Sequence, residues 1–336
     1  MAAVTAEDAA KIVSKARRES VVIEEVERKH LSGFDAFTPI TSYVVRTGDG
    51  TSYLLKVAPT STVVSTNYSP NSLASVHELL KLILDSNTGI PTPEILDYDA
   101  SRSLVPCPYL LLAHPKGVPL ALARASGKLS PRQLVMLDLL LGQYLKRMHD
   151  TIQMDWFGLP SQSADGLYSW QEAFTPLVEG ALDDAEAAGI ALPYADLRVC
   201  LSRAIGFFLF DDCEVPSLVT FTGDDATTLV DFDPDRGADA EVAVTSFAAV
   251  GHALWGDPLL EAMWMAPSEA FVEGYGSPLV LFARQKTKRL WYTLFLALVV
   301  LEQARQDPGH VDENKVKWAD EEVVKVAEAL KTAPCY

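Results

Sequence analysis

The sequence predicts an α+β protein with two lobes, a small strand-rich N-terminal lobe and a larger helical C-terminal lobe. A chain of 336 residues is longer than one compact core usually accommodates, which favours two units. The first third contains a hairpin pattern, and from Ser130 onward apolar residues recur at helical spacing. We place the boundary near residue 116, so that residues 1–116 form the first lobe and residues 117–336 the second.

The N-terminal lobe is predicted from a hairpin and a helix. Residues 42–57 contain two β-rich runs joined by a Gly-Asp-Gly turn, and Lys56 lies near the end of the second run. Residues 73–84 carry apolar side chains on one helical face, with Glu78 among them. Two further extended segments follow, at residues 90–99 and 108–113.

The C-terminal lobe is predicted to be mainly helical. Ser130 before Pro131 is typical of a helix start, and leucines then recur at helical spacing as far as His149. The remaining elements are helices at residues 170–188, 195–208, 278–306 and 321–331, short strands around Leu218 and Leu229, and a segment at 247–264 that begins extended and ends helical.

Composition excludes several classes of partner. The net charge of -17 opposes binding to nucleic acid or to an anionic membrane surface. The most apolar run, residues 290–301, is too short for a bilayer, which needs about 20 residues. The N-terminus lacks the pattern of a secretory signal, and the four cysteines form no C-x-x-C motif, so we expect reduced thiols in the cytoplasm. The sequence leaves the oligomeric state open.

An ordered series of short motifs indicates a family resemblance. Lys56 on a strand and Glu78 on the next helix are followed by a loop between two short strands at residues 218–231. Around that loop stand Leu145-Lys-Arg-Met-His149, Phe157-Gly-Leu-Pro160 and Trp255-Gly-Asp-Pro-Leu-Leu-Glu261. This series resembles the aminoglycoside phosphotransferase and choline kinase-like superfamily, with its protein kinase-like fold, and looks most like the fungal branch.

Loop 218–231 resembles the family's catalytic loop in the spacing of its residues but lacks the reactive ones. Thr220, Thr222 and Thr227 stand where the family has a histidine, the catalytic aspartate and a metal-binding asparagine. Phe221 replaces a usual glycine, and Ala249 stands where a second metal-binding aspartate is expected. The resemblance also implies that Lys56 and Glu78 would pair near the nucleotide phosphates.

These replacements predict a cleft that has lost phosphotransferase chemistry and needs neither a metal nor a nucleotide cofactor. An uncharged, more apolar cleft suits a hydrophobic small molecule, such as a biosynthetic intermediate of secondary metabolism. Such a site can support a non-phosphoryl reaction through orientation, for example a cyclisation, an isomerisation or an addition. The candidate catalytic residues are Thr220, Thr222, Asp224 and His252, and the candidate ligand-binding residues are Lys56, Glu78, Phe221, Thr227 and Ala249.

Two alternatives remain open from the sequence. A non-catalytic pseudokinase would regulate or scaffold a partner, with Lys56 and Glu78 holding a nucleotide or a closed lobe arrangement. A weak ATP-dependent phosphotransferase would instead use Asp224, Asp225 or Asp231 in place of the missing carboxylates.

Overall fold

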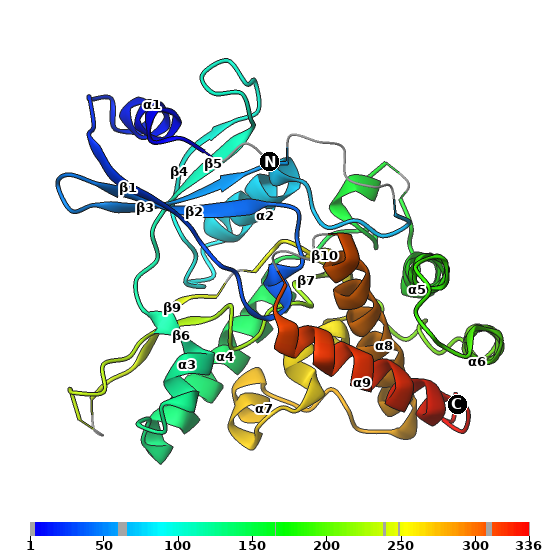
Figure 1. Cartoon of the computed structure of the whole chain (residues 1–336). Helices are drawn as coiled ribbons and strands as arrows, with labels where there is room; N and C mark the ends of the chain where they lie inside the picture. Colours follow the sequence, from blue (N-terminus) through cyan, green and yellow to red (C-terminus); the bar gives the residue numbers. More distant parts are fainter. Residues whose placement is uncertain are drawn as a thin grey trace.

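The computed structural model describes residues 4–59, 66–164, 166–237, 240–247, 249–306 and 311–335. Figure 1 shows a sheet-containing lobe built from the first third of the chain, packed against a helical lobe built from the remainder. The predicted α+β architecture with two lobes is therefore confirmed.

Five antiparallel strands form the N-terminal sheet, in the order β1-β2-β3-β5-β4. The predicted hairpin is confirmed, since β2 and β3 pair from Thr41 opposite Val57 to Arg46 opposite Ser52. Lys56 lies on the central strand of the sheet. The strands are β1 (Ile23–Arg28), β2 (Thr41–Thr47), β3 (Ser52–Val57), β4 (Ile95–Asp99) and β5 (Tyr109–Ala113).

One helix covers each face of this sheet (Figure 1). Helix α2 (Leu73–Asp85) packs its apolar side chains against Leu110 and Leu112 in the main core, as predicted. Helix α1 (Ala6–Arg17) covers the other face, where Ile12 joins a separate apolar cluster. Its presence was not predicted, although the Thr5 hydroxyl accepts the Asp8 N–H at 3.1 Å in a capping box, which is a sequence-level helix signal.

The C-terminal lobe is built on α4 (Pro131–Thr151), which begins where the sequence predicts. The Ser130 hydroxyl accepts the N–H of Gln133 at 3.3 Å, and Pro131 occupies the first turn, where its missing N–H costs nothing. The other helices are α3 (Leu120–Ala125), α5 (Trp170–Ala187), α6 (Tyr194–Gly206), α7 (Glu269–Tyr275), α8 (Ala283–Gln306) and α9 (Glu313–Leu330).

Two C-terminal predictions need correction. Helix α9 begins at Glu313 rather than 321, because the Asp312 carboxylate caps it by accepting the N–H groups of Asn314 and Lys315. In the described residues of segment 247–264, the predicted extended start and helical end take the form of a short strand and 3-10 turns, without an α-helix. These elements are β10 (Leu254–Gly256), η3 (Pro258–Leu260) and η4 (Ala262–Met265), and a short 3-10 turn, η2 (Pro160–Gln162), lies earlier in the chain.

Two small sheets hold loop 218–231 beneath the N-terminal lobe. At one end β7 (Ser217–Val219) pairs with β10, and at the other β8 (Leu229–Asp231) lies between β6 (Val118–Pro119) and β9 (Ala243–Ser246). The predicted short strands around Leu218 and Leu229 are thus confirmed. Because both ends are anchored in separate sheets, the residues between them have a fixed path.

Among the helices that the structure describes, none is both long enough and apolar enough to cross a membrane. The four cysteines, Cys107, Cys200, Cys213 and Cys335, are free thiols.

An interlobe cavity above a buried loop

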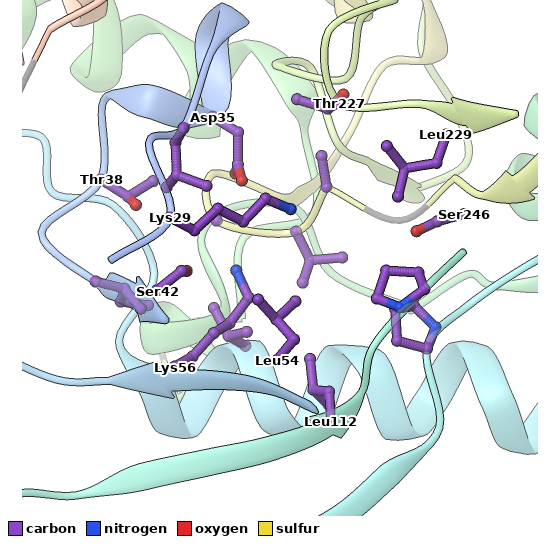
Figure 2. Close-up of a pocket in the computed structure, with 18 of the residues that line it drawn as sticks. Lys29, Asp35, Thr38, Ser42, Leu54, Lys56, Leu112, Thr227, Leu229 and Ser246 are labelled. Carbon is purple, nitrogen blue, oxygen red and sulfur yellow. The ribbon is translucent and has the colours of Figure 1, made fainter. Parts of the chain in front are cut away.

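A cavity of about 150 Å³ lies between the two lobes. The sheet and α2 contribute aliphatic side chains from one side, and the region around β8 and β9 closes the other (Figure 2). The apolar part of the wall consists of Ile40, Leu54, Val76, Leu80, Leu112, Leu229 and Val250, and Thr227, Ser246 and Ala249 complete the floor.

Three charged side chains line this cavity, namely Lys29, Asp35 and Lys56. Figure 2 shows the two amino groups and the carboxyl group directed into the same space, from the residue after β1, from η1 (Gly33–Ala36) and from β3. Burial lowers the pKa of Lys29 and the charge of Lys56 lowers it further, while Asp35 opposes both effects. Burial also raises the pKa of the Asp35 carboxyl, against the opposing charges of the two lysines.

The β1–β2 loop (residues 29–40) lies directly on loop 218–231. A Cβ added at Gly33, which has a φ of +68°, would come within 2.6 Å of Asp224 Oδ1 and 2.7 Å of Ala226 Cβ. The Gly33 N–H donates to Asp312 Oδ2 at 2.9 Å, at the start of α9. Phe34 lies between the lobes, with its ring 5.1 Å from that of Trp318. The β1–β2 loop is thus in contact with loop 218–231 on one side and with α9 on the other.

Thr220 and Thr222 are buried beneath this contact and do not line the cavity. Thr220 donates through its hydroxyl to Glu261 Oε2 at 2.8 Å and through its N–H to Glu261 Oε1 at 2.7 Å. Glu261 also contacts His149, whose other ring nitrogen bonds the Tyr275 hydroxyl. Thr222, only 1% exposed, donates to the Thr220 carbonyl. The prediction that these two hydroxyls face an open cleft is corrected, because the buried Glu261 turns Thr220 inward.

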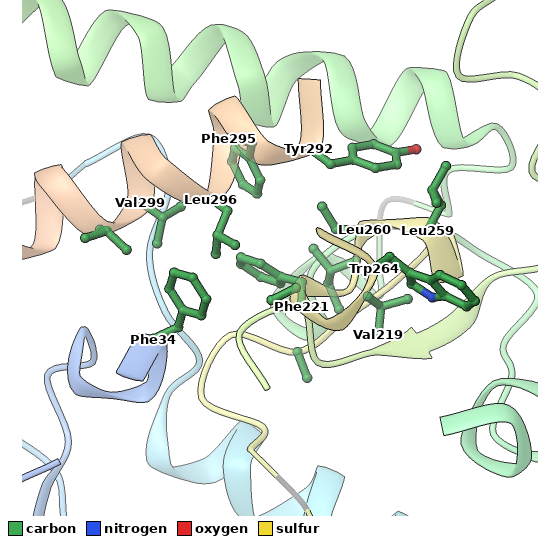
Figure 3. Close-up of a cluster of buried hydrophobic side chains, with 14 of the residues drawn as sticks. Phe34, Val219, Phe221, Leu259, Leu260, Trp264, Tyr292, Phe295, Leu296 and Val299 are labelled. Carbon is green, nitrogen blue, oxygen red and sulfur yellow. The ribbon is translucent and has the colours of Figure 1, made fainter. Parts of the chain in front are cut away.

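Phe221 likewise belongs to the core and is not a ligand-contacting residue. Its ring is completely buried and packs against those of Tyr68 and His252. It also packs against Phe295, which is labelled near it in Figure 3. Its φ of +38° is unusual for a bulky residue, and conformations of this kind persist only where the surroundings fix them. The Phe221 side chain therefore occupies core space and does not line the ligand site that the sequence suggested.

His252 joins the lobes but does not face the cavity. Its Nε2–H donates to the carbonyl of Phe37 at 2.8 Å, which leaves Nδ1 to accept the Tyr68 hydroxyl at 2.8 Å. Burial lowers the pKa of His252 to about 4, so the ring is neutral near pH 7. This geometry gives His252 a bracing role and corrects its assignment as a candidate catalytic residue.

The expected pair between Lys56 and Glu78 does not form. Glu78 has a side chain that is 70% exposed, and it bonds His77 Nδ1 at 2.9 Å. The reason is helical geometry. Val76 and Leu80 line the cavity, and a residue two positions from each lies on the opposite side of a helix that turns every 3.6 residues.

Thr227 and Ala249 do line the cavity floor, whereas the candidate aspartates have structural partners. Asp224 accepts the N–H groups of Ala226 and Thr227 and pairs with Lys315 at 2.9 Å. The other two candidates do not line the cavity. Asp225 pairs with Arg124 at 2.7 Å, and Asp231, whose side chain is 52% exposed, pairs with Arg236.

Sequence reasoning missed three residues that organise this region, Lys29, Asp35 and Glu261. Lys29 and Asp35 belong to a connection between strands, where no periodic pattern indicates which side chains turn inward. Glu261 is part of the quoted Trp255–Glu261 motif, but only the folded chain shows that it binds Thr220.

A second, more polar hollow of about 770 Å³ lies on the other side of Asp224. Both cations that line it are already paired, since Arg124 pairs with Asp138 and Asp225 while Lys315 pairs with Asp224. Ala226 and Pro119 separate it from the interlobe cavity, because both residues line both spaces.

The fold is similar to those of several solved phosphotransferase structures. A protein assigned as a fructosamine-3-kinase from Haemophilus somnus aligns with a TM-score of 0.62 at 13% identity, over 95% of this chain and 96% of its own. A protein assigned as an aminoglycoside phosphotransferase from Ralstonia eutropha gives 0.59 at 11% identity, over 96% of both chains. An aminoglycoside phosphotransferase in complex with AMP-PNP and hygromycin B gives 0.55 at 16% identity, over 96% of this chain and 98% of its own.

No protein-family model and no curated protein matches the sequence. At identities this low, the structural likeness establishes the protein kinase-like fold alone.

Proposed function

We propose that this kinase-fold protein binds a small, largely apolar organic molecule in its interlobe cavity and does not transfer phosphoryl groups. The observation that carries the proposal is the cavity wall, which is mainly aliphatic and has only a few polar groups directed inward. Small-molecule sites typically combine such a wall with a small number of orienting polar groups.

The residues at the family's reactive positions do not fit a metal-bound triphosphate. Magnesium is held in proteins by carboxylate oxygens, yet the two positions that would supply ligands are Thr227 and Ala249. The Thr227 hydroxyl already donates to the Asp224 carbonyl at 3.0 Å. Moreover, the β1–β2 loop and loop 218–231 are in direct contact at Gly33 and Asp224. We therefore assign no step to a nucleotide or a metal ion.

The size of the cavity limits the ligand. A volume of 150 Å³ is far smaller than a nucleoside triphosphate requires. An apolar cavity of about this volume holds one benzene-sized molecule. We infer that the enclosed part of the ligand is a single ring or a branched chain of comparable size, with any larger part extending out of the cavity.

The polar groups indicate how such a ligand is oriented. The Ser42 Oγ is buried on the cavity wall and has no hydrogen-bond partner in the described structure, so a ligand oxygen or N–H group would relieve an unpaired polar atom. The amino groups of Lys29 and Lys56 point into the cavity beside one carboxyl group, that of Asp35. An oxygen-bearing end is therefore expected to face the lysines, with the apolar part against Leu54 and Leu112.

Thermal unfolding with two probes tests this proposal. Benzyl alcohol, which matches the cavity in size, is expected to raise the unfolding temperature in a saturable manner, since a ligand at 100 times its Kd stabilises a protein by about 2.7 kcal/mol. ATP with magnesium is expected to produce no shift and no ADP. A shift with ATP but without turnover would instead support a nucleotide-binding pseudokinase, and accumulation of ADP would establish a phosphotransferase.

A pair of matched variants locates the binding site. Ala249→Leu fills the floor of the cavity and is expected to abolish the benzyl alcohol shift. Ala266→Leu makes the same change in the second hollow and is expected to preserve that shift. Equal effects of both variants, or no shift in the parent protein, would contradict ligand binding in the interlobe cavity.

A further inference from the structure

The charged side chains of the cavity differ from the structural ion pairs elsewhere in the protein. Among the residues that the structure describes, the ammonium groups of Lys29 and Lys56 form no ion pair or hydrogen bond with a fixed partner. Both point into the cavity together with the Asp35 carboxyl (Figure 2). By contrast, the buried Lys288 pairs with both Asp212 and Asp257. The two cavity lysines are thus open to a ligand.

The surroundings of Lys29 favour an uncharged amine. Burial and the nearby charge of Lys56 both lower the Lys29 pKa, and a lysine placed beside a second cation in a partly apolar pocket is a recognised form of activated nucleophile. The effect of Lys29 extends to His114, whose pKa is lowered by burial and then by the Lys29 charge. His30, on the cavity wall, is the remaining titratable neighbour that the described structure provides.

Asp35 is placed to handle protons beside these amines. A Cβ added at Gly251 would come within 3.0 Å of Asp35 Oδ1, so the carboxyl group is held against the backbone at the cavity edge. Its pKa is raised by burial, with the negative charge of Asp224 adding to that effect. A raised pKa brings a carboxyl group closer to the range in which it can both donate and accept a proton.

We infer that Lys29 forms an imine with a small aldehyde or ketone bound in the interlobe cavity, with Lys56 and Asp35 as its supporting groups. This inference rests on the proposed small-molecule-binding function and adds the chemical class of the ligand. The cavity then serves to hold a carbonyl compound with its apolar part among the aliphatic side chains and its C=O group at the lysines.

The step is balanced without any further reagent. The lone pair of the uncharged Lys29 Nζ attacks the carbonyl carbon, and the C=O π electrons move to the oxygen. The resulting carbinolamine loses its hydroxyl group as water when a C=N bond forms. Asp35 carries two protons in turn from the nitrogen to the oxygen. The first transfer converts the initial N⁺–C–O⁻ adduct into the neutral carbinolamine, and the second accompanies departure of the hydroxyl group as water and leaves the Asp35 carboxyl group as it began. One molecule of water is released, and no oxidation or reduction takes place.

Reductive trapping on the full chain tests this inference. The protein is incubated with benzaldehyde and sodium cyanoborohydride near neutral pH, and the sites of added benzyl groups are mapped by peptide mass spectrometry. We expect Lys29 to be labelled faster than the exposed Lys128, because a lowered pKa leaves more free amine at a given pH and the cavity holds the aldehyde beside it. Benzyl alcohol, which has no carbonyl group, is expected to protect Lys29 by occupying the cavity.

Three variants separate the contributions. Lys29→Arg keeps the charge but removes the reactive amine, and it is expected to abolish the fast labelling, whereas Lys128→Arg is the matched control that leaves it intact. Lys56→Met removes the neighbouring charge and is expected to slow labelling of Lys29, because the Lys29 pKa rises. The comparison of Lys29 with Lys128 within the parent protein does not depend on any variant folding.

The outcomes distinguish this inference from the proposed function. If benzyl alcohol binds the cavity but Lys29 reacts no faster than Lys128, the imine inference is wrong and the binding function stands. If benzyl alcohol neither binds nor protects Lys29, the binding function is wrong, and any labelling of Lys29 would then be surface chemistry. Fast, protectable labelling at Lys29 supports both.

Discussion

Gly33→Ala is the most informative single substitution, because it probes the contact between the β1–β2 loop and loop 218–231. Gly33 lies in the β1–β2 loop with a φ of +68°, and an added Cβ would come within 2.6 Å of Asp224 Oδ1 and 2.7 Å of Ala226 Cβ. The Asp224 carboxyl cannot easily yield, since it accepts two backbone N–H groups and pairs with Lys315.

Two costs contribute to the expected destabilisation. Placing a non-glycine residue in the left-handed region costs about 1–2 kcal/mol, and overpacking a well-filled contact adds about 1–3 kcal/mol. Gly50→Ala isolates the first cost, because Gly50 has a φ of +81° and a Cβ there would meet nothing within 4 Å. We therefore expect Gly33→Ala to lower the free energy of unfolding by about 2–5 kcal/mol and Gly50→Ala by about 1–2 kcal/mol.

Urea denaturation, followed by tryptophan fluorescence, measures both variants on the same scale. The difference between them gives the energy of the contact between the β1–β2 loop and loop 218–231. Equal destabilisation by the two variants would refute the reasoning, because it would mean that the two loops do not touch in solution.

Three further predictions concern buried polar groups. His252 has a pKa lowered from 6.5 to about 4, so the unfolded state binds more protons between these values. Stability should therefore fall by about 3 kcal/mol as the pH falls through this window, and pH-dependent urea denaturation of His252→Gln should lack that loss. The effect of pH on Glu302 has the opposite sign. Burial, together with the negative charge of Asp184, raises the pKa of Glu302 from 4.5 to about 9. The stabilising contribution of the protonated carboxyl group is therefore lost as the pH rises through that range. Glu302→Gln should thus unfold at a higher temperature than the parent protein in alkaline buffer, but not at a pH below 4.5, the pKa of the unfolded state. A difference in unfolding temperature that stays the same at every pH would contradict this assignment. Thr220→Val should lower the free energy of unfolding by about 1.5–3 kcal/mol, because it removes a buried hydrogen bond to Glu261, while leaving benzyl alcohol binding intact. Loss of benzyl alcohol binding without loss of stability would indicate instead that Thr220 contacts the ligand.

The sequence by itself determined the order and type of most elements. Hairpin 42–57, the helix that starts at Ser130 and the short strands at Leu218 and Leu229 all form where local patterns indicate. Such patterns are readable because turn residues, caps and apolar periodicity act over a few neighbouring positions. Loop 218–231 could also be located, and its lack of the expected carboxylates and amide is a property of the sequence alone.

Only the tertiary structure decided what surrounds that loop. The sequence placed Thr222 and Phe221 in a cleft, but both are buried, and Tyr68 and Phe295 from distant segments pack against the Phe221 ring. The sequence also predicted a pair between Lys56 and Glu78, but α2 is oriented so that Val76, and not Glu78, lines the cavity. Which side chains converge on a space depends on contacts between residues far apart in the chain, and burial and neighbouring charge then set the chemistry of Lys29 and Asp35. No local sequence pattern encodes the burial of a side chain or the charges that surround it.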